Sequence, residues 1–365
     1  GINDNPLDEC GNCHGDGFAD TCVGSDACSD MACDGDCDQV AYIDDCGECD
    51  DSANTDCVDV VINLSTGANL VSFYALSDDV SVETIFGDAY GVITEGAAAV
   101  NIDGNWIGSL EEVSQDEGYW VIATETSALE ILDADPINYD ADGEVVYALH
   151  YGPNLISYSY NIQQSIGDGL GDASTSMYGI MTQGMGAFYI DNTWVGSLQA
   201  FVGGNGYWFL ALDDISFTFT EPSTDMARVA IQPELRSVPV EYKYIQSTKQ
   251  AFYFVESATI VGNPLDSDDI IIAYNNDVIV GARYWGGEYT DIPAMGYDQY
   301  VDNTGYCKEG DKIHFKVWDA SIAELIDMVT DTDIVWSDLS MSVVNLTEIL
   351  PESYTLESAY PNPFN

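Results

Sequence analysis

Apolar and polar residues alternate over short stretches through most of this chain, a pattern typical of half-buried β-strands. The first strands are predicted at 60–64, 69–75, 98–102, 105–110, 118–122 and 129–132. Asp103 and Gly104 stand between two of them as a two-residue hairpin signal. Val82, Ile85 and Phe86 have the spacing of one short amphipathic helix. The pattern therefore predicts a mainly β protein.

This group of strands recurs further along the chain. The segments 69–74, 90–96, 106–110 and 118–120 return as 154–159, 178–184, 194–198 and 206–208. The offset is 85 residues at the first segment and 88 at the others. Such self-similarity indicates repeated structural units. We therefore expect two tandem small β domains, at 60–145 and 146–224.

A larger β domain, expected to be sandwich-like, follows at 225–350. Its predicted strands lie at 251–255, 270–274, 278–284, 312–318 and 341–346. The turn at 275–277 predicts a hairpin between two of these strands. The chain is thus predicted to be multidomain.

Residues 1–59 have a different composition. They contain nine of the ten cysteines and seventeen Asp and Glu, with no Lys or Arg. Aliphatic side chains are almost absent, so disulfides and bound cations are expected to stabilise the segment. Calcium suits acidic loops because it accepts six to eight oxygen ligands in irregular geometry. The predicted calcium ligands are Asp16, Asp20, Asp34, Asp36, Asp38, Asp44, Asp45 and Asp50. A solvated, disordered acidic segment is the alternative.

The segment also contains a Cys-x-x-Cys-His motif, the attachment sequence of haem c. Cys10 and Cys13 would hold the haem and His14 would be its proximal ligand, with His150 or His314 as a second axial ligand. The segment 46–50 repeats the frame without the histidine, which favours an ordinary disulfide repeat over haem.

The odd number of N-terminal cysteines leaves one without a partner inside the segment. Three explanations are open: this cysteine pairs with the tenth cysteine, Cys307, it bonds to another chain, or its partner lay upstream of the given sequence. Cys307 is thus also a candidate for an intersubunit disulfide. A bond from Cys307 to an N-terminal cysteine of the next subunit would give a head-to-tail polymer, because such contacts do not close.

Charge narrows the classes of partner. The formal net charge is −55, and all eight basic residues follow residue 227. Nucleic acids and anionic membranes are excluded as partners because both require basic patches. No apolar run reaches about 18 residues, so membrane insertion is not expected. The cysteines indicate an oxidising, extracellular compartment.

Several segments resemble modules of proteins secreted by the type IX system. The ending 354–365, with Tyr-Pro-Asn-Pro-Phe-Asn, resembles the entry into a C-terminal sorting domain, so 351–365 is expected to be a linker into that domain. The tandem repeats look like the Asn-Leu-Ile-Ser and Gly-Tyr-Trp units of such proteins, and 268–283 is similar to a β module from the same setting. The segment 16–22 resembles a thrombospondin type 3 half-repeat.

The resemblance implies a secreted or cell-surface protein of a Gram-negative bacterium and names no activity. In many relatives of the β module a cysteine stands at the position of Ile279 and pairs with the one matching Cys307. Here that partner is absent, which puts a local disulfide of Cys307 in doubt.

The motifs of metalloproteases, serine hydrolases and phosphate-binding loops are missing, so no enzyme is predicted. The leading hypothesis is a non-enzymatic extracellular structural or adhesive protein that self-associates into a calcium-stabilised fibre or surface layer. The second is a carbohydrate-binding accessory region of a secreted polysaccharide-degrading system, with Trp106 and Trp194 as glycan contacts; packing in each domain's core is the alternative for both rings. The third is a monohaem electron-transfer protein.

Overall fold

The computed structural model describes residues 42–43, 49–50, 58–136, 145–223, 231–300 and 302–349. These residues are mainly β, as the sequence pattern predicted. They fold as two compact units, the first ending at Tyr178 and resuming over 200–232, the second made of 179–199 and the chain from Pro233 onward. The domain limits predicted from the sequence stay predictions. In the described part of the chain, no helix is long and apolar enough to cross a membrane.

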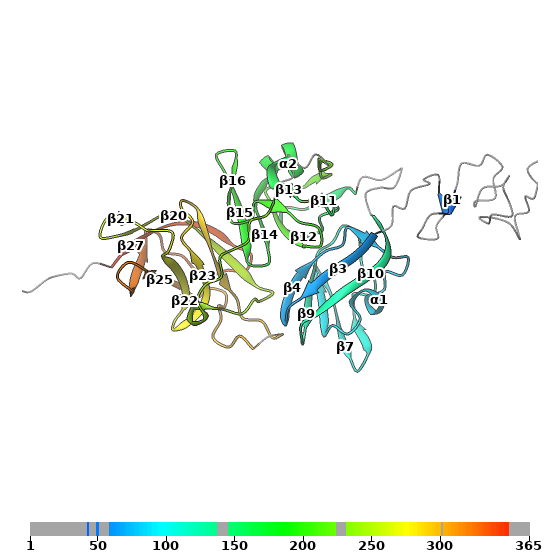
Figure 1. Cartoon of the computed structure of the whole chain (residues 1–365), viewed down its shortest axis with the longest axis horizontal. Helices are drawn as coiled ribbons and strands as arrows, with labels where there is room; N and C mark the ends of the chain where they lie inside the picture. The colour runs from blue at the N-terminus through cyan, green and yellow to red at the C-terminus, as the bar shows by residue number, and fades with distance from the viewer. Residues whose placement is uncertain are drawn as a thin grey trace, which may run out of the picture. The chain divides into compact units, whose positions relative to one another are not determined.

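The first repeat consists of two antiparallel sheets and one short helix (Figure 1). The five-stranded sheet has the order β4-β9-β6-β7-β8, and the three-stranded sheet has the order β3-β10-β5. The elements are β3 (Val58–Leu64), β4 (Gly67–Val71), β5 (Ala75–Leu76), α1 (Val82–Phe86), β6 (Gly91–Thr94), β7 (Ala97–Ile102), β8 (Asn105–Gly108), β9 (Tyr119–Ala123) and β10 (Ser127–Pro136). A short bridge earlier in the chain joins β1 (Tyr42–Ile43) to β2 (Cys49–Asp50).

Local sequence signals explain two features of this repeat. Asp103 and Gly104 both have positive φ, +52° and +83°, as a type I′ hairpin turn requires, and the strands beside them pair as predicted. Helix α1 begins after Ser81, whose hydroxyl oxygen accepts a hydrogen bond from the backbone N–H of Thr84 at 3.3 Å. The predicted hairpin and the predicted helix are both confirmed.

The second repeat has a similar succession of elements, with a 3₁₀ turn and a short strand that the described part of the first repeat does not have. Its elements are β11 (Tyr147–Leu149), β12 (Gly152–Ile156), β13 (Gln164–Ser165), α2 (Ile166–Leu170), the 3₁₀ turn η1 (Gly171–Ser176), β14 (Met177–Thr182), β15 (Met185–Ile190), β16 (Thr193–Gly196), β17 (Ala200–Phe201), β18 (Tyr207–Ala211) and β19 (Ile215–Phe217). The pairing of β12 with β18 matches that of β4 with β9, and the hairpin β15–β16 matches β7–β8. The recurring sequence therefore forms a recurring structure.

The recurring motifs also join the two repeats. The backbone N–H of Gly118 donates to the carbonyl of Leu155 at 3.2 Å, and that of Gly206 donates to the carbonyl of Leu70 at 3.3 Å. Each Gly-Tyr-Trp motif thus bonds to the Asn-Leu motif of the other repeat. We call this pair of hydrogen bonds, with the strands that carry it, the reciprocal contact. It closes on itself, as a two-fold arrangement does.

The second unit is built around a curled β-sheet. The strand order is β21-β20-β27-β26-β25-β22-β23, and β24 pairs with β20. Its elements are the 3₁₀ turn η2 (Val240–Tyr242) and the strands β20 (Gln250–Ile260), β21 (Asn263–Pro264), β22 (Ile270–Asn275), β23 (Val278–Tyr284), β24 (Thr290–Met295), β25 (Ile313–Asp319), β26 (Glu324–Thr330) and β27 (Met341–Glu348). The core includes Tyr253, Phe315 and Trp336, all at most 2% exposed.

The structure departs from the predicted strands at several places, and two of them show the effect of tertiary contacts. The strand predicted at 69–75 leaves the sheet after Val71, because the backbone N–H of Ser72 bonds to the carbonyl of Gly204 at 3.0 Å in the other repeat. Strand β24 was not predicted, since it contains Asp291 and Pro293 although every residue in it is buried. Tertiary contacts override the local pattern at both places.

Candidate functional site

The N-terminal candidates lie outside the described residues. This holds for the haem candidates and for all but one of the predicted calcium ligands: Cys10, Cys13, His14, Asp16, Asp20, Asp34, Asp36, Asp38, Asp44 and Asp45. The remaining predicted ligand is Asp50, whose backbone belongs to β2 but whose side chain is not described. Among the described residues, no group of three or more His, Cys, Asp or Glu is arranged to hold a metal ion. Calcium and haem binding stay predictions.

The two tryptophans suggested as glycan contacts pack against neighbouring rings. Trp106 of β8 is half-buried against the core of the first repeat, with its ring centroid 6.3 Å from that of Phe86. Trp194 of β16 is half-buried and lies 4.9 Å, centroid to centroid, from Tyr189 on the paired strand. This geometry favours the packing interpretation of Trp106 in particular.

Cys307 is 1% exposed and forms no disulfide with any described residue. Burial raises the pKa of its thiol to about 12. A thiol in this position reacts with a second chain only after local opening. The geometry therefore argues against Cys307 as an intersubunit bridge.

The second unit contains a cavity of about 510 Å³ lined by aromatic and charged side chains. Tyr284 ends β23, Trp285 and Tyr289 belong to the loop that follows, and all three are half-buried. Arg236, from the segment before η2, and Arg283 supply two of the eight basic residues of the whole chain. We call this the aromatic cavity.

The loop between β23 and β24 is held in one conformation. The hydroxyl of Thr290 donates to the carbonyl of Gly287 at 2.6 Å and accepts from the N–H of Gly286 at 2.9 Å. Tyr289 has φ +61°, in the left-handed region that bulky residues rarely adopt and that costs on the order of 1–3 kcal/mol. Its hydroxyl donates to Glu256 at 3.2 Å. Strain of this kind concentrates at binding sites.

Arg236 covers one face of Tyr284. The guanidinium carbon lies 3.7 Å from the ring centroid, a cation–π contact. Arg236 also donates to Asp268 at 2.8 Å, and this hydrogen bond is the main reason that the pKa of the guanidinium is raised. The side chain of Arg236 is 57% exposed, so it remains available to a ligand at the mouth of the cavity.

A buried ion pair also lines the aromatic cavity. Arg283 and Asp291 approach to 3.5 Å with side-chain exposures of 9% and 1%. Asp291 accepts hydrogen bonds from the N–H of Gly186 at 3.0 Å and from the N–H and hydroxyl of Ser197 at 2.9 and 2.8 Å. Burial raises the pKa of Asp291 above its ordinary value, against the lowering effect of Arg283 and these donors. The carboxylate therefore fixes the hairpin β15–β16 beside the cavity.

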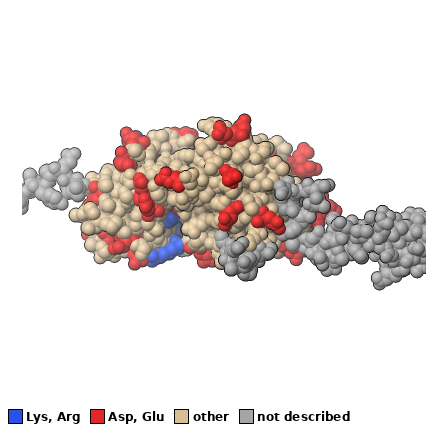
Figure 2. All heavy atoms as spheres, turned by 90° about the horizontal axis from the view of Figure 1, so that it is seen from above, with Lys and Arg blue, Asp and Glu red and all other residues tan. Residues whose placement is uncertain are grey.

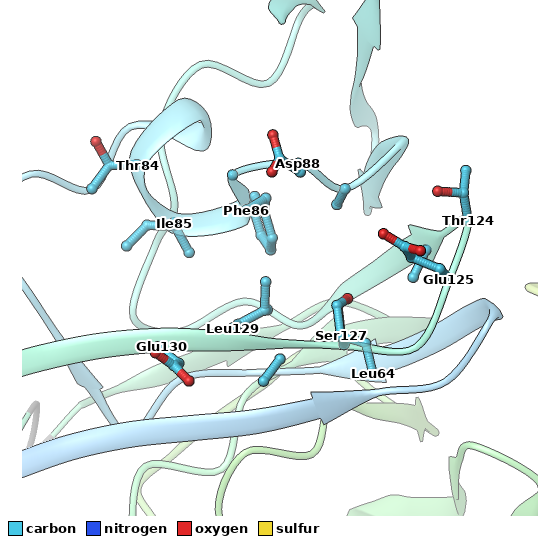
Figure 3. Close-up of a pocket in the computed structure, with 14 residues that line it drawn as sticks. Leu64, Thr84, Ile85, Phe86, Asp88, Thr124, Glu125, Ser127, Leu129 and Glu130 are labelled. Carbon is cyan, nitrogen blue, oxygen red and sulfur yellow. The ribbon is translucent and has the colours of Figure 1, made fainter.

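Two other cavities are chemically poorer. One of about 370 Å³ in the first repeat lies between α1 and β10, with Phe86 and Leu129 inside and Asp88 and Glu125 on separate loops at its rim (Figure 3). Its lining has acidic groups but no Lys or Arg. Another of about 390 Å³ in the second unit is lined mainly by turn residues, with Lys308 over the ring of Tyr297 at 5.1 Å.

The aromatic cavity is the best candidate because it combines ring faces with hydrogen-bond donors and acceptors. Figure 2 shows acidic side chains scattered over the face it draws, whereas Lys and Arg are gathered at one place. No sequence pattern predicted this site. The run 284–289, two tyrosines and a tryptophan around a glycine pair, was the available signal, but its convergence with Arg236 is not visible in sequence.

No model of a protein family, no curated protein and no solved structure matches the chain.

Proposed function

We propose that the protein is a non-catalytic, extracellular adhesive protein that holds a saccharide in the aromatic cavity. One observation carries the proposal: Tyr284, Trp285 and Tyr289 line a single cavity together with Arg236 and Arg283. The saccharide partner considered from the sequence is thus assigned to a different surface from the one suggested there.

A sugar ring matches this lining. It has an apolar face, formed by C–H groups, and a rim of hydroxyls that both donate and accept hydrogen bonds. The half-buried rings offer apolar faces, the exposed guanidinium of Arg236 donates, and the exposed carboxylates of Glu234 and Glu288 accept. The volume of about 510 Å³ lies within the usual range for small-ligand sites, about 300–1,000 Å³.

The side chains around the cavity favour binding over catalysis. Its lining contains no histidine or cysteine. Both oxygens of Asp291 already accept hydrogen bonds from the hairpin, so this carboxylate is committed to structure. Holding a ligand requires only the preorganised rings and donors.

Removing Trp285 is expected to abolish most of the saccharide binding. Trp285→Ala should weaken binding about tenfold or more, because a truncated aromatic anchor typically costs at least about 1.4 kcal/mol. The measurement is affinity electrophoresis of the full chain in gels containing neutral glucans, xylan or alginate, followed by calorimetry with matching oligosaccharides.

Tyr151→Ala is the matched control, since Tyr151 is 72% exposed and lies in the first unit. It should migrate like the wild type in every gel. Equal retardation of Trp285→Ala and the wild type would contradict the proposal, as would the absence of retardation by any polysaccharide of the panel.

The extracellular setting is inferred from the cysteine-rich, acidic segment 1–59 and from the resemblance to secreted modules at the surface of Gram-negative bacteria. We also propose that calcium stabilises this segment, since its seventeen carboxylates have no Lys or Arg beside them in sequence. Self-association into a polymer or layer stays a prediction of the sequence.

Chelation is expected to affect the N-terminal segment alone. With a calcium chelator, residues 1–59 should be cleaved by protease much faster, while the urea-unfolding transitions of the two β units stay unchanged. Mass spectrometry of the fragments locates the cuts. Calcium, but not magnesium, should restore protection, because calcium tolerates irregular acidic loops better. Equal cleavage with and without chelator would remove the support for calcium.

A further inference from the structure

The outer face of the five-stranded sheet in the first repeat is apolar across its width. Four residues on neighbouring strands are direct cross-strand partners and form one row on this face: Ile122 of β9, Gly91 of β6, Val100 of β7 and Ile107 of β8. The β9 end of this face is covered: Trp120 and Ile122 pack with residues of the second repeat. We call the other end, formed by β7 and β8, the open face.

Within the first unit, the outer edge of the open face is exposed to solvent. Ile102 is 52% and Ile107 57% exposed. A Cβ atom added to Gly91, which lies on this face, would meet only backbone atoms of the neighbouring strand, at Ala99 and Val100. The outward side chains of this part of the sheet, Ala98, Val100, Ile102, Asn105 and Ile107, carry no charge, although the chain as a whole carries −55.

The equivalent surface of the second repeat is covered within the second unit. Phe188, at the position of Val100, lies 5.5 Å from Phe254 of β20 between ring centroids. A Cβ atom added to Gly179, the counterpart of Gly91, would lie 2.2 Å from the sulfur of Met341. This surface of the repeat fold is therefore an interface in the second repeat and open in the first.

The covered end of the sheet face, in the first unit, shows what kind of surface packs against it. The cluster at the covered end joins Leu70 and Trp120 to Leu155 and Trp208. In the repeat alignment, Leu155 is the counterpart of Leu70, and Trp208 is the counterpart of Trp120. Within the first unit, the sheet face of one repeat thus packs against the equivalent residues of the other repeat.

We propose that the open face pairs with the open face of a second copy of this chain. The occupant is a second copy because the face is continuous with a contact between equivalent residues and because its uncharged side chains avoid the repulsion between two acidic chains. Because Ala98 carries only a methyl group and Gly91 no side chain, they leave space for the side chains of Ile102 and Ile107 from the partner. This proposal is independent of saccharide binding.

The test is sedimentation equilibrium of the full chain in reducing agent, at about 1 M salt, where the Debye length is about 3 Å and charge repulsion is screened. The wild type should form a dimer as concentration rises. Ile107→Glu and Ile102→Glu should each raise the dimer dissociation constant about a hundredfold or more, because a two-fold interface contains each substitution twice.

Val146→Glu is the control, since Val146 is 59% exposed in the same unit but outside the open face. It should dimerise like the wild type. Circular dichroism melts establish that all three variants remain folded. A wild type that stays monomeric at every concentration would overturn the proposal, and so would a dimer that Ile107→Glu and Ile102→Glu leave unchanged or that Val146→Glu weakens equally.

Discussion

Replacing Asp291 with alanine is expected to destabilise the second unit by about 3–5 kcal/mol, because it leaves Arg283 buried without a counter-charge. The substitution also removes the acceptor for the N–H groups of Gly186 and Ser197. Urea unfolding measures the overall loss. Hydrogen exchange of the segment 183–199 measures the local one, and this segment should lose protection first.

Two further variants separate the ion pair from general disruption. Asp268→Ala removes an exposed carboxylate from the ion pair with Arg236, and we expect little or no loss of stability because solvent screens exposed pairs. The double variant Asp291→Leu with Arg283→Met should be less destabilised than either single substitution, since no unpaired buried charge remains. If Asp291→Ala unfolds at the same urea concentration as Asp268→Ala, the structural role assigned to the buried pair is wrong.

Adding a methyl group to Gly206 should weaken the contact between the two repeats. A Cβ atom there would lie 2.6 Å from the carbonyl oxygen of Val71, too close for backbone atoms that cannot move independently. Gly206→Ala is expected to destabilise the first unit by about 1–3 kcal/mol. Because the reciprocal contact is two-fold, Gly118→Ala should behave in the same way, with 2.9 Å to the carbonyl oxygen of Ile156.

Gly167 provides the matched control for these glycines. It lies in α2, and a Cβ atom there would meet nothing within 4 Å. Gly167→Ala should leave stability unchanged or raise it by up to about 1 kcal/mol, since alanine is the better helix former. Thermal and urea unfolding of the three variants give the comparison. An unaltered midpoint for both Gly206→Ala and Gly118→Ala would show that the reciprocal contact contributes little.

Local signals in the sequence were sufficient for much of the first unit. The Asp103-Gly104 hairpin and the helix after Ser81 form because the residues that specify them lie within a few positions of one another. The repeat was visible because the same motifs return at nearly constant spacing. The recurring Tyr119 and Tyr207 make equivalent hydrogen bonds, since their hydroxyls accept from the N–H of Ser114 at 2.6 Å and of Val202 at 2.7 Å.

The candidate site could not be predicted in the same way. Tyr284 and Arg236 are 48 positions apart, and nothing in their neighbourhoods indicates that a guanidinium lies over that ring. The aromatic residues that the sequence did highlight, Trp106 and Trp194, recur at matching places because both repeats pack them against neighbouring rings. Recurrence thus identified packing positions and not the cavity.

The sequence by itself determined the β class, the repeat, the first hairpin and the first helix, since each depends on residues close together in the chain. Only the tertiary structure decided that Asp291 is buried, because its hydrogen-bond donors Gly186 and Ser197 stand 105 and 94 positions away. It also decided that residues 179–199 fold with the second unit and that the outer edge of the open face is exposed to solvent within the first unit. Burial is a property of distant partners, and short-range alternation of apolar and polar residues does not specify them.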